Sequence, residues 1–246
     1  MARHFSISAT ALLAILSVPA SAQTVGVSAV VVNDVRMTTQ ADPVVHKAVV
    51  KERFSLGNDI TTGRASLFQV LLHDRTSFTV GSNARIKVDR FVYDPSRSTS
   101  SVGLSVVKGA FRFIPGEPLH ANPGQSAIRT PIASINIRGA IVEGAVGADA
   151  IRIGRGERAI PAGLKPDPET ASLIFLRSPG ASVEGSERPG AIDMTLGYIT
   201  ITVTGSGKAM FAPGAGQPLI GPFELSASGS TALADLLRKP RRGGPG

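Results

Sequence analysis

The sequence predicts two short strands and the turn that joins them in residues 67–80, Leu-Phe-Gln-Val-Leu-Leu-His-Asp-Arg-Thr-Ser-Phe-Thr-Val. In the second half, Phe78 and Val80 alternate with polar neighbours, as expected for a strand with one buried face. In the first half both faces are apolar, which predicts a strand at the centre of a sheet. Asp74-Arg75 lies between the halves and predicts a tight turn.

Similar short strands continue to Gly139, with turn signals such as Thr62-Gly63 between them. Ile86 and Val88 have the opposite parity to Phe91 and Tyr93, and a β-bulge near residues 89–90 would return all four to one face. Lys108-Gly109 predicts a positive φ or a bulge. The predicted core comprises Phe68, Val70, Phe78, Val80, Ile86, Val88, Phe111, Phe113, Ile135 and Ile137.

Strands this short are not stable alone, so the chain is expected to be all-β, a sandwich or a flattened β-solenoid, with one short C-terminal helix. The pattern does not choose between the two architectures. Beyond Gly139, further strands are predicted, among them residues 150–153, and residues 230–237 read as a helix capped by Ser230 or Thr231. We expect a β domain over residues 23–154, a loop or linker over 155–170, a C-terminal β lobe over 171–229, and the short helix with a basic tail over 230–246.

An export signal is predicted over residues 1–22. Arg3 and His4 precede an apolar run, which ends in Ala20-Ser21-Ala22 before Gln23. The run is shorter than a membrane span needs, and polar residues interrupt every later apolar segment, so no transmembrane span is expected. The mature chain is therefore expected in the periplasm or outside the cell.

Composition narrows the classes of partner. The chain has no cysteine, so its fold must depend on a packed core rather than on disulfides. The formal net charge is +8, and it falls to +3 once Arg3 and the four basic residues of 238–242 are set aside. The basicity is thus mostly a tail, which could attract an anionic cell-wall polymer. The body shows no basic stripe with interleaved aromatics, so nucleic acid is not expected as a partner.

An ordered set of motifs resembles the FecR domain. The set comprises Leu56-Gly-Asn-Asp-Ile-Thr-Thr-Gly63, Leu71-Leu-His-Asp-Arg-Thr76, Val107-Lys-Gly-Ala-Phe-Arg-Phe113, and Thr130-Pro131 with Ile135-Asn-Ile-Arg-Gly139. The family usually has Asp-Gly-Ser at Asp74-Arg75-Thr76 and Arg-Gly-Thr at Arg138-Gly139-Ala140. The resemblance implies a periplasmic β domain that recognises another cell-envelope protein. The cytoplasmic segment and membrane span of the family's regulators are absent here, so this chain is similar to exported, stand-alone members.

Catalytic and metal-binding patterns are not found in the sequence. His46, His73 and His120 are scattered without ligand spacing, and no serine-hydrolase or zinc-protease motif occurs. Asp59, Asp74 and Asp89 are predicted at strand ends, where an aspartate usually caps a turn rather than acting on a glycan. We therefore expect no catalytic residue, no metal and no cofactor, and a protein that is not an enzyme.

Arg138 is the single residue selected as a candidate for partner binding. It could face a partner carboxylate, or it could pair with Asp59 or Asp74 and tie the sheet together, and the second interpretation is favoured. The leading hypothesis is a binding or signalling module that contacts another envelope protein through an exposed sheet edge or loop. The alternative is a carbohydrate or cell-wall binding module, although the chain has only two tyrosines and no tryptophan.

Overall fold

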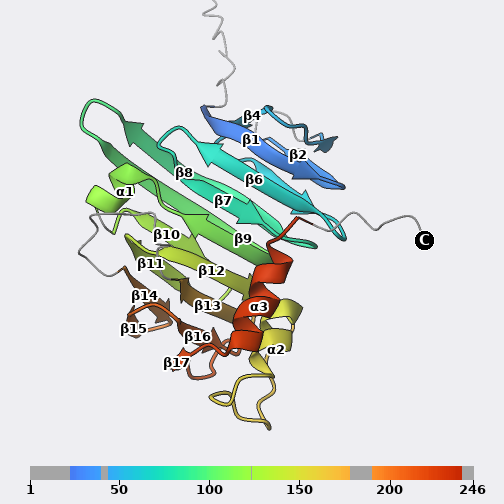
Figure 1. The fold of residues 1–246 in the computed structure, drawn as a ribbon, viewed down its shortest axis with the longest axis vertical. Coiled ribbons are helices and arrows are strands. Elements are labelled where there is room, and N and C mark those ends of the chain that lie inside the picture. Colours follow the sequence, from blue (N-terminus) through green and yellow to red (C-terminus); the bar gives the residue numbers. More distant parts are fainter. Residues whose placement is uncertain (1–22, 40–43, 123, 178–189, 240–246) are drawn as a thin grey trace, which may run out of the picture.

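The computed structural model describes residues 23–39, 44–122, 124–177 and 190–239. These residues form a large open, mixed β-structure of 17 strands, which confirms the all-β prediction (Figure 1). Every strand pairing is antiparallel except the one between β9 (Thr99–Ile114) and β10 (Ser126–Arg129). The ladders divide into two layers, sheet A and sheet B, and β9 belongs to both.

Sheet A contains, in spatial order, β4 (Arg53–Ser55), β1 (Thr24–Val32), β6 (Leu67–Leu72), β7 (Ser77–Val80), the second part of β9, β12 (Ile141–Val146), β13 (Ser172–Arg177), β16 (Lys208–Ala212) and β17 (Ile220–Glu224). Sheet B contains β3 (His46–Lys47), β2 (Val35–Thr38), β5 (Asp59–Thr62), β8 (Arg85–Asp94), the first part of β9, β10, β11 (Ser134–Arg138), β14 (Ala191–Leu196) and β15 (Ile199–Thr204). Strands from before and after residue 170 pair directly in both sheets.

The change of sheet within β9 depends on Gly109. Up to Lys108 the strand pairs with β8, and from Gly109 onward it pairs with β12. Gly109 has a φ of +84°, and a Cβ at this position would lie 2.4 Å from the Cβ of Ala84. The positive φ predicted for Gly109 is confirmed, because only glycine fits both the backbone angle and the close approach.

The core between the two sheets holds all ten residues predicted for it. Each is no more than 1% exposed, and they join one apolar cluster that includes residues from both sheets. The bulge predicted near residues 89–90 is also present, because the pairing register shifts between Val88 and Arg90. Leu71 departs from the prediction. β6 does lie between β1 and β7, but Leu71 is 43% exposed and belongs to neither apolar cluster of the described residues.

Two helices cover part of the outer face of sheet A. α2 (Ala148–Gly154) and α3 (Ala227–Leu236) pack there (Figure 1), and their Ile151 and Leu233 join a second apolar cluster with Phe175 of the sheet. The strand predicted over residues 150–153 is therefore wrong, because this segment is helical. A short apolar run has no periodicity that separates a buried strand from a buried helix.

The C-terminal helix is confirmed, but it begins earlier than predicted. Its N-cap is Ser226, whose hydroxyl accepts from the Gly229 N–H at 3.0 Å, rather than Ser230 or Thr231. The Ser226 hydroxyl and backbone N–H both donate to the buried Glu157 carboxylate. This partner lies 69 residues away in the chain, so local sequence does not reveal the start of the helix.

Two further features complete the described part of the chain. A short helix, α1 (Glu117–Ala121), follows β9 and buries Leu119. No helix of the described residues is long and apolar enough to cross a membrane. Among these residues, no helix covers the outer face of sheet B.

Candidate binding surfaces

Arg138 lies on the outer face of sheet B, at the end of β11. Its Nη2 lies 3.0 Å from Oδ1 of Asp193 on β14, and the same oxygen accepts from the Thr202 hydroxyl of β15 at 2.7 Å. The three side chains form a polar ladder across three neighbouring strands. The Arg138 side chain remains 40% exposed, so it contributes to the surface as well as to the sheet.

The aspartates predicted to pair with Arg138 have other partners. Asp59 pairs with Arg85 across β5 and β8. Asp74 is buried and accepts from the backbone N–H and hydroxyl of Thr76, which fixes the β6–β7 turn. The idea that Arg138 ties strands together therefore agrees with the geometry, but the predicted partners are wrong. The pairing of β11 with β14, more than 50 residues later, brings Asp193 to Arg138.

The β14–β15 hairpin forms one lateral end of sheet B. Gly197 and Tyr198 make its two-residue turn, and Gly197 has a φ of +58°. Tyr198 is fully exposed and Ile199 is 56% exposed. Within the described residues, β15 has a strand partner on one side only, which leaves backbone N–H and C=O groups along its other side for an added strand.

The outer face of sheet B carries the excess positive charge of the body. Its outward positions hold eight basic and four acidic residues, a net of +4, whereas the chain without Arg3 and the basic residues of 238–242 has +3. The basic residues are Arg36, Lys47, Arg85, Lys87, Arg90, Lys108, Arg129 and Arg138, and the acidic residues are Asp59, Asp89, Asp94 and Asp193.

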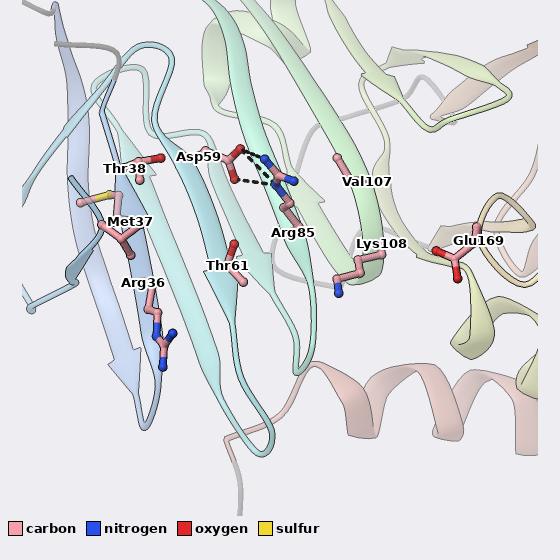
Figure 2. Close-up of a pocket in the computed structure, with 10 residues that line it drawn as sticks. Arg36, Met37, Thr38, Asp59, Thr61, Arg85, Val107, Lys108 and Glu169 are labelled. Atoms are coloured by element: carbon pink, nitrogen blue, oxygen red, sulfur yellow. Dashed lines mark hydrogen bonds and ion pairs between the residues drawn. The ribbon is translucent and has the colours of Figure 1, made fainter. Parts of the chain in front are cut away.

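Four of these cations belong to one row across the strands. Lys47, Arg36, Thr61, Arg85 and Lys108 are successive register partners on β3, β2, β5, β8 and β9. A cleft of about 570 Å³ lies over the row (Figure 2). Val45, Val107 and Glu169 also line this cleft, and Glu169 comes from the loop before β13.

Carboxylates hold the two arginines of the row from one side. Asp59 accepts from Nε and Nη2 of Arg85, with a shortest distance of 2.7 Å, and this hydrogen bonding, with the charge of Asp59, raises the pKa of Arg85. Oδ1 of Asp34 accepts from Nε of Arg36 at 3.1 Å. Each guanidinium is thereby oriented while it keeps further N–H donors.

Buried charges elsewhere have structural partners. Glu143 has no exposed side-chain surface, and its Oε1 lies 2.5 Å from Nε of Arg112 and 3.1 Å from Nη1 of Arg177. These three residues connect β12 to its neighbours β9 and β13 on the outer face of sheet A. The sequence prediction missed this cluster because each member appears alone in its own strand.

The histidines of the described residues do not form a cluster. Nε2 of His46 lies 2.6 Å from Glu52, and the His73 ring packs edge-on against Phe91. Over the described ranges, no group of three or more histidine and acidic residues is placed to hold a metal ion.

Comparisons with known proteins give a weak likeness in fold. No family model matches the sequence, and no curated protein matches it. Two crystal structures of a candidate anti-sigma factor from Parabacteroides distasonis ATCC 8503 are similar to this chain, each with 9% sequence identity and a TM-score of 0.41. The match covers 68% of this chain and 60% of the other protein. A likeness at this level concerns the arrangement of strands and assigns no function.

Proposed function

We propose that this chain is an exported, non-enzymatic FecR-like protein that binds another cell-envelope protein. The contact is an extended segment of the partner, which adds to β15 as a further strand of sheet B. The predicted signal over residues 1–22 lies outside the described residues, so the periplasmic or secreted location rests on the sequence pattern alone.

The free side of β15 is the observation that carries this proposal. An open sheet edge recognises an extended peptide through main-chain hydrogen bonds. Leu196 and Ile199 flank the two-residue turn and form a hydrogen-bonded pair. Non-hydrogen-bonded and hydrogen-bonded pairs then alternate along the hairpin, so Thr200 and Thr202 belong to non-hydrogen-bonded pairs. The backbone groups of Thr200 and Thr202 therefore point away from β14, toward an added strand.

Side chains at the edge support selection of a partner. Tyr198 and Ile199 offer apolar surface at the hairpin tip, and tyrosine supplies large contact area at low entropic cost. Arg138 lies two strands in from the edge, within the polar ladder through Asp193 and Thr202. This position allows Arg138 to meet a carboxylate of the partner.

The enzyme hypothesis and the carbohydrate hypothesis have less support. Of the aspartates considered for catalysis, Asp59 pairs with Arg85, Asp74 caps a turn, and Asp89 accepts a hydrogen bond from Ser105. A neutral glycan is usually held by stacking on aromatic rings, and of the chain's two tyrosines only Tyr198 is strongly exposed.

A substitution pair at Thr200 tests the proposal. Thr200→Pro removes an outward N–H that β14 does not use, and edge strands tolerate proline at such positions. Thr200→Val is the matched control, because both variants lose the hydroxyl contact with Thr195 but valine keeps the N–H. Tagged mature proteins are cross-linked in envelope extracts, and the captured proteins are identified.

We expect the parent and the Thr200→Val variant to capture one dominant protein, and the Thr200→Pro variant to lose it while its melting temperature stays close to the control's. Equal capture by both variants would exclude β15 as the contact. Co-sedimentation of the parent with purified sacculi, without a protein partner, would instead support the cell-wall alternative.

A further inference from the structure

We propose that the outer face of sheet B binds an acidic polysaccharide, along a basic band that runs from Lys47 on β3 to Arg129 on β10. This ligand site is separate from the β15 edge. The proposal of a polysaccharide site is therefore tested independently of the proposed protein partner.

The first argument is the number of cations without a counter-ion. Within the described ranges, no ion pair involves Lys47, Lys87, Arg90, Lys108 or Arg129, although all five are exposed on this face. Cations that lie on one face without counter-ions repel one another, and an anionic ligand relieves that repulsion.

The second argument is the length of the band. The first row runs from Lys47 to Lys108 over four strand spacings, and a second row, Lys87 to Ser105 to Arg129, continues onto β10. With strands about 4.8 Å apart, the five spacings from β3 to β10 give roughly 24 Å. A single small anion would contact only a fraction of this length, whereas a polymer with an anionic group in successive repeats would follow it.

The third argument is the preorganisation of the arginines. Asp34 and Asp59 hold Arg36 and Arg85 through their Nε sides, which leaves terminal N–H groups for a ligand. A fixed guanidinium loses little conformational freedom when it binds a second oxyanion. The hydroxyl of Thr61 lies between these arginines in the row and can bond to a sugar hydroxyl.

An acidic peptide fits the band less well than a polysaccharide. The band lies on the face of the sheet, where the strands' backbone groups are already used in the ladders, so strand addition is not available there. Apart from Val45, Val107 and the buried Met37 at the cleft, the band consists mainly of charged and hydroxyl side chains, which offer few apolar anchors to a peptide. Of the carboxylates at the band, Asp59 is paired with Arg85, whereas an anionic ligand must avoid Glu169 in the cleft lining and Asp89, which accepts from Ser105.

Binding to defined polymers tests the site. Fluorescently labelled polygalacturonate is titrated with the mature protein at low salt and at 150 mM salt, with poly-L-glutamate and neutral dextran as competitors. The band variant carries Lys87→Gln, Lys108→Gln and Arg129→Gln. The control variant carries Arg155→Gln, Arg158→Gln and Lys165→Gln, three exposed cations in the segment that follows α2, none of which lines the cleft.

We expect salt-sensitive binding that the band variant weakens about tenfold, the order expected when three exposed ion pairs are lost. The control variant should stay within about twofold of the parent, since it has the same net charge as the band variant. Absence of binding to polygalacturonate, or equal weakening in both variants, would overturn the proposal. Stronger competition by poly-L-glutamate than by unlabelled polygalacturonate would overturn it in favour of an acidic protein segment.

Discussion

Replacing Phe111 by alanine tests the arrangement of the core directly. The ring is 1% exposed and lies over Gly144, its cross-strand neighbour on β12. A Cβ on Gly144 would lie 2.6 Å from two atoms of the ring. Truncation of a fully buried phenylalanine removes its transfer free energy and leaves a cavity, so Phe111→Ala should lower the free energy of unfolding by about 3–5 kcal/mol.

The same contact predicts a coupling with Gly144→Ala. In the parent, the added methyl group collides with the ring and should cost about 1–3 kcal/mol. In the Phe111→Ala background the ring is absent, and of the three atoms nearest to the added Cβ the Leu173 carbonyl oxygen, at 2.8 Å, remains. The Gly144 substitution should therefore cost on the order of 1 kcal/mol less there. Urea unfolding followed by circular dichroism gives all four free energies; a Phe111→Ala cost below about 1 kcal/mol, or strict additivity, would refute this packing.

Three further predictions follow from the structure and one from the sequence. Glu143→Gln should lower the free energy of unfolding by about 2–4 kcal/mol, because it breaks a buried charge cluster, and a loss under about 1 kcal/mol in urea unfolding would contradict this. Arg138→Ala should cost about 1 kcal/mol, given its half-exposed ion pair. A melt shifted no more than by a neutral surface substitution would refute this structural role, and weaker capture of the partner by the same variant would make Arg138 a partner-binding residue. The Ser96 hydroxyl donates a hydrogen bond to the Asp94 carboxylate and lowers the pKa of Asp94. The folded state gains stability from this bond at pH values above the ordinary aspartate pKa, and loses it as the pH falls through the pKa of Asp94 in the folded protein. Ser96→Ala should therefore raise the pKa of Asp94 measured by NMR titration. The mature chain should begin at Gln23, and N-terminal sequencing of the exported protein would decide this.

Most of the β-structure could be predicted because its determinants are local. Alternation of apolar and polar residues placed Phe78, Val80, Ile86 and Val88 in the core, since successive side chains of a strand point to opposite faces. The change of parity after Val88 revealed the bulge for the same reason. Residues 150–153 were misassigned because a short apolar run fits a buried helix as well as a strand.

The candidate surfaces could be predicted only in part. Arg138 was selected from its strand, but its partner Asp193 comes from a strand that local sequence does not place beside it. The basic band is harder to see, because Lys47, Arg85 and Lys108 are far apart in the sequence and become neighbours only through strand register.

The sequence by itself therefore determined the β class, the core face of most strands and the glycine at which β9 bends, because each depends on neighbouring residues and backbone sterics. Only the tertiary structure decided which strands pair, which side chains form the polar ladder at Arg138, and which face is left uncovered and basic. These features depend on contacts between residues tens of positions apart, whose formation is governed by the packing of the whole core rather than by any local preference.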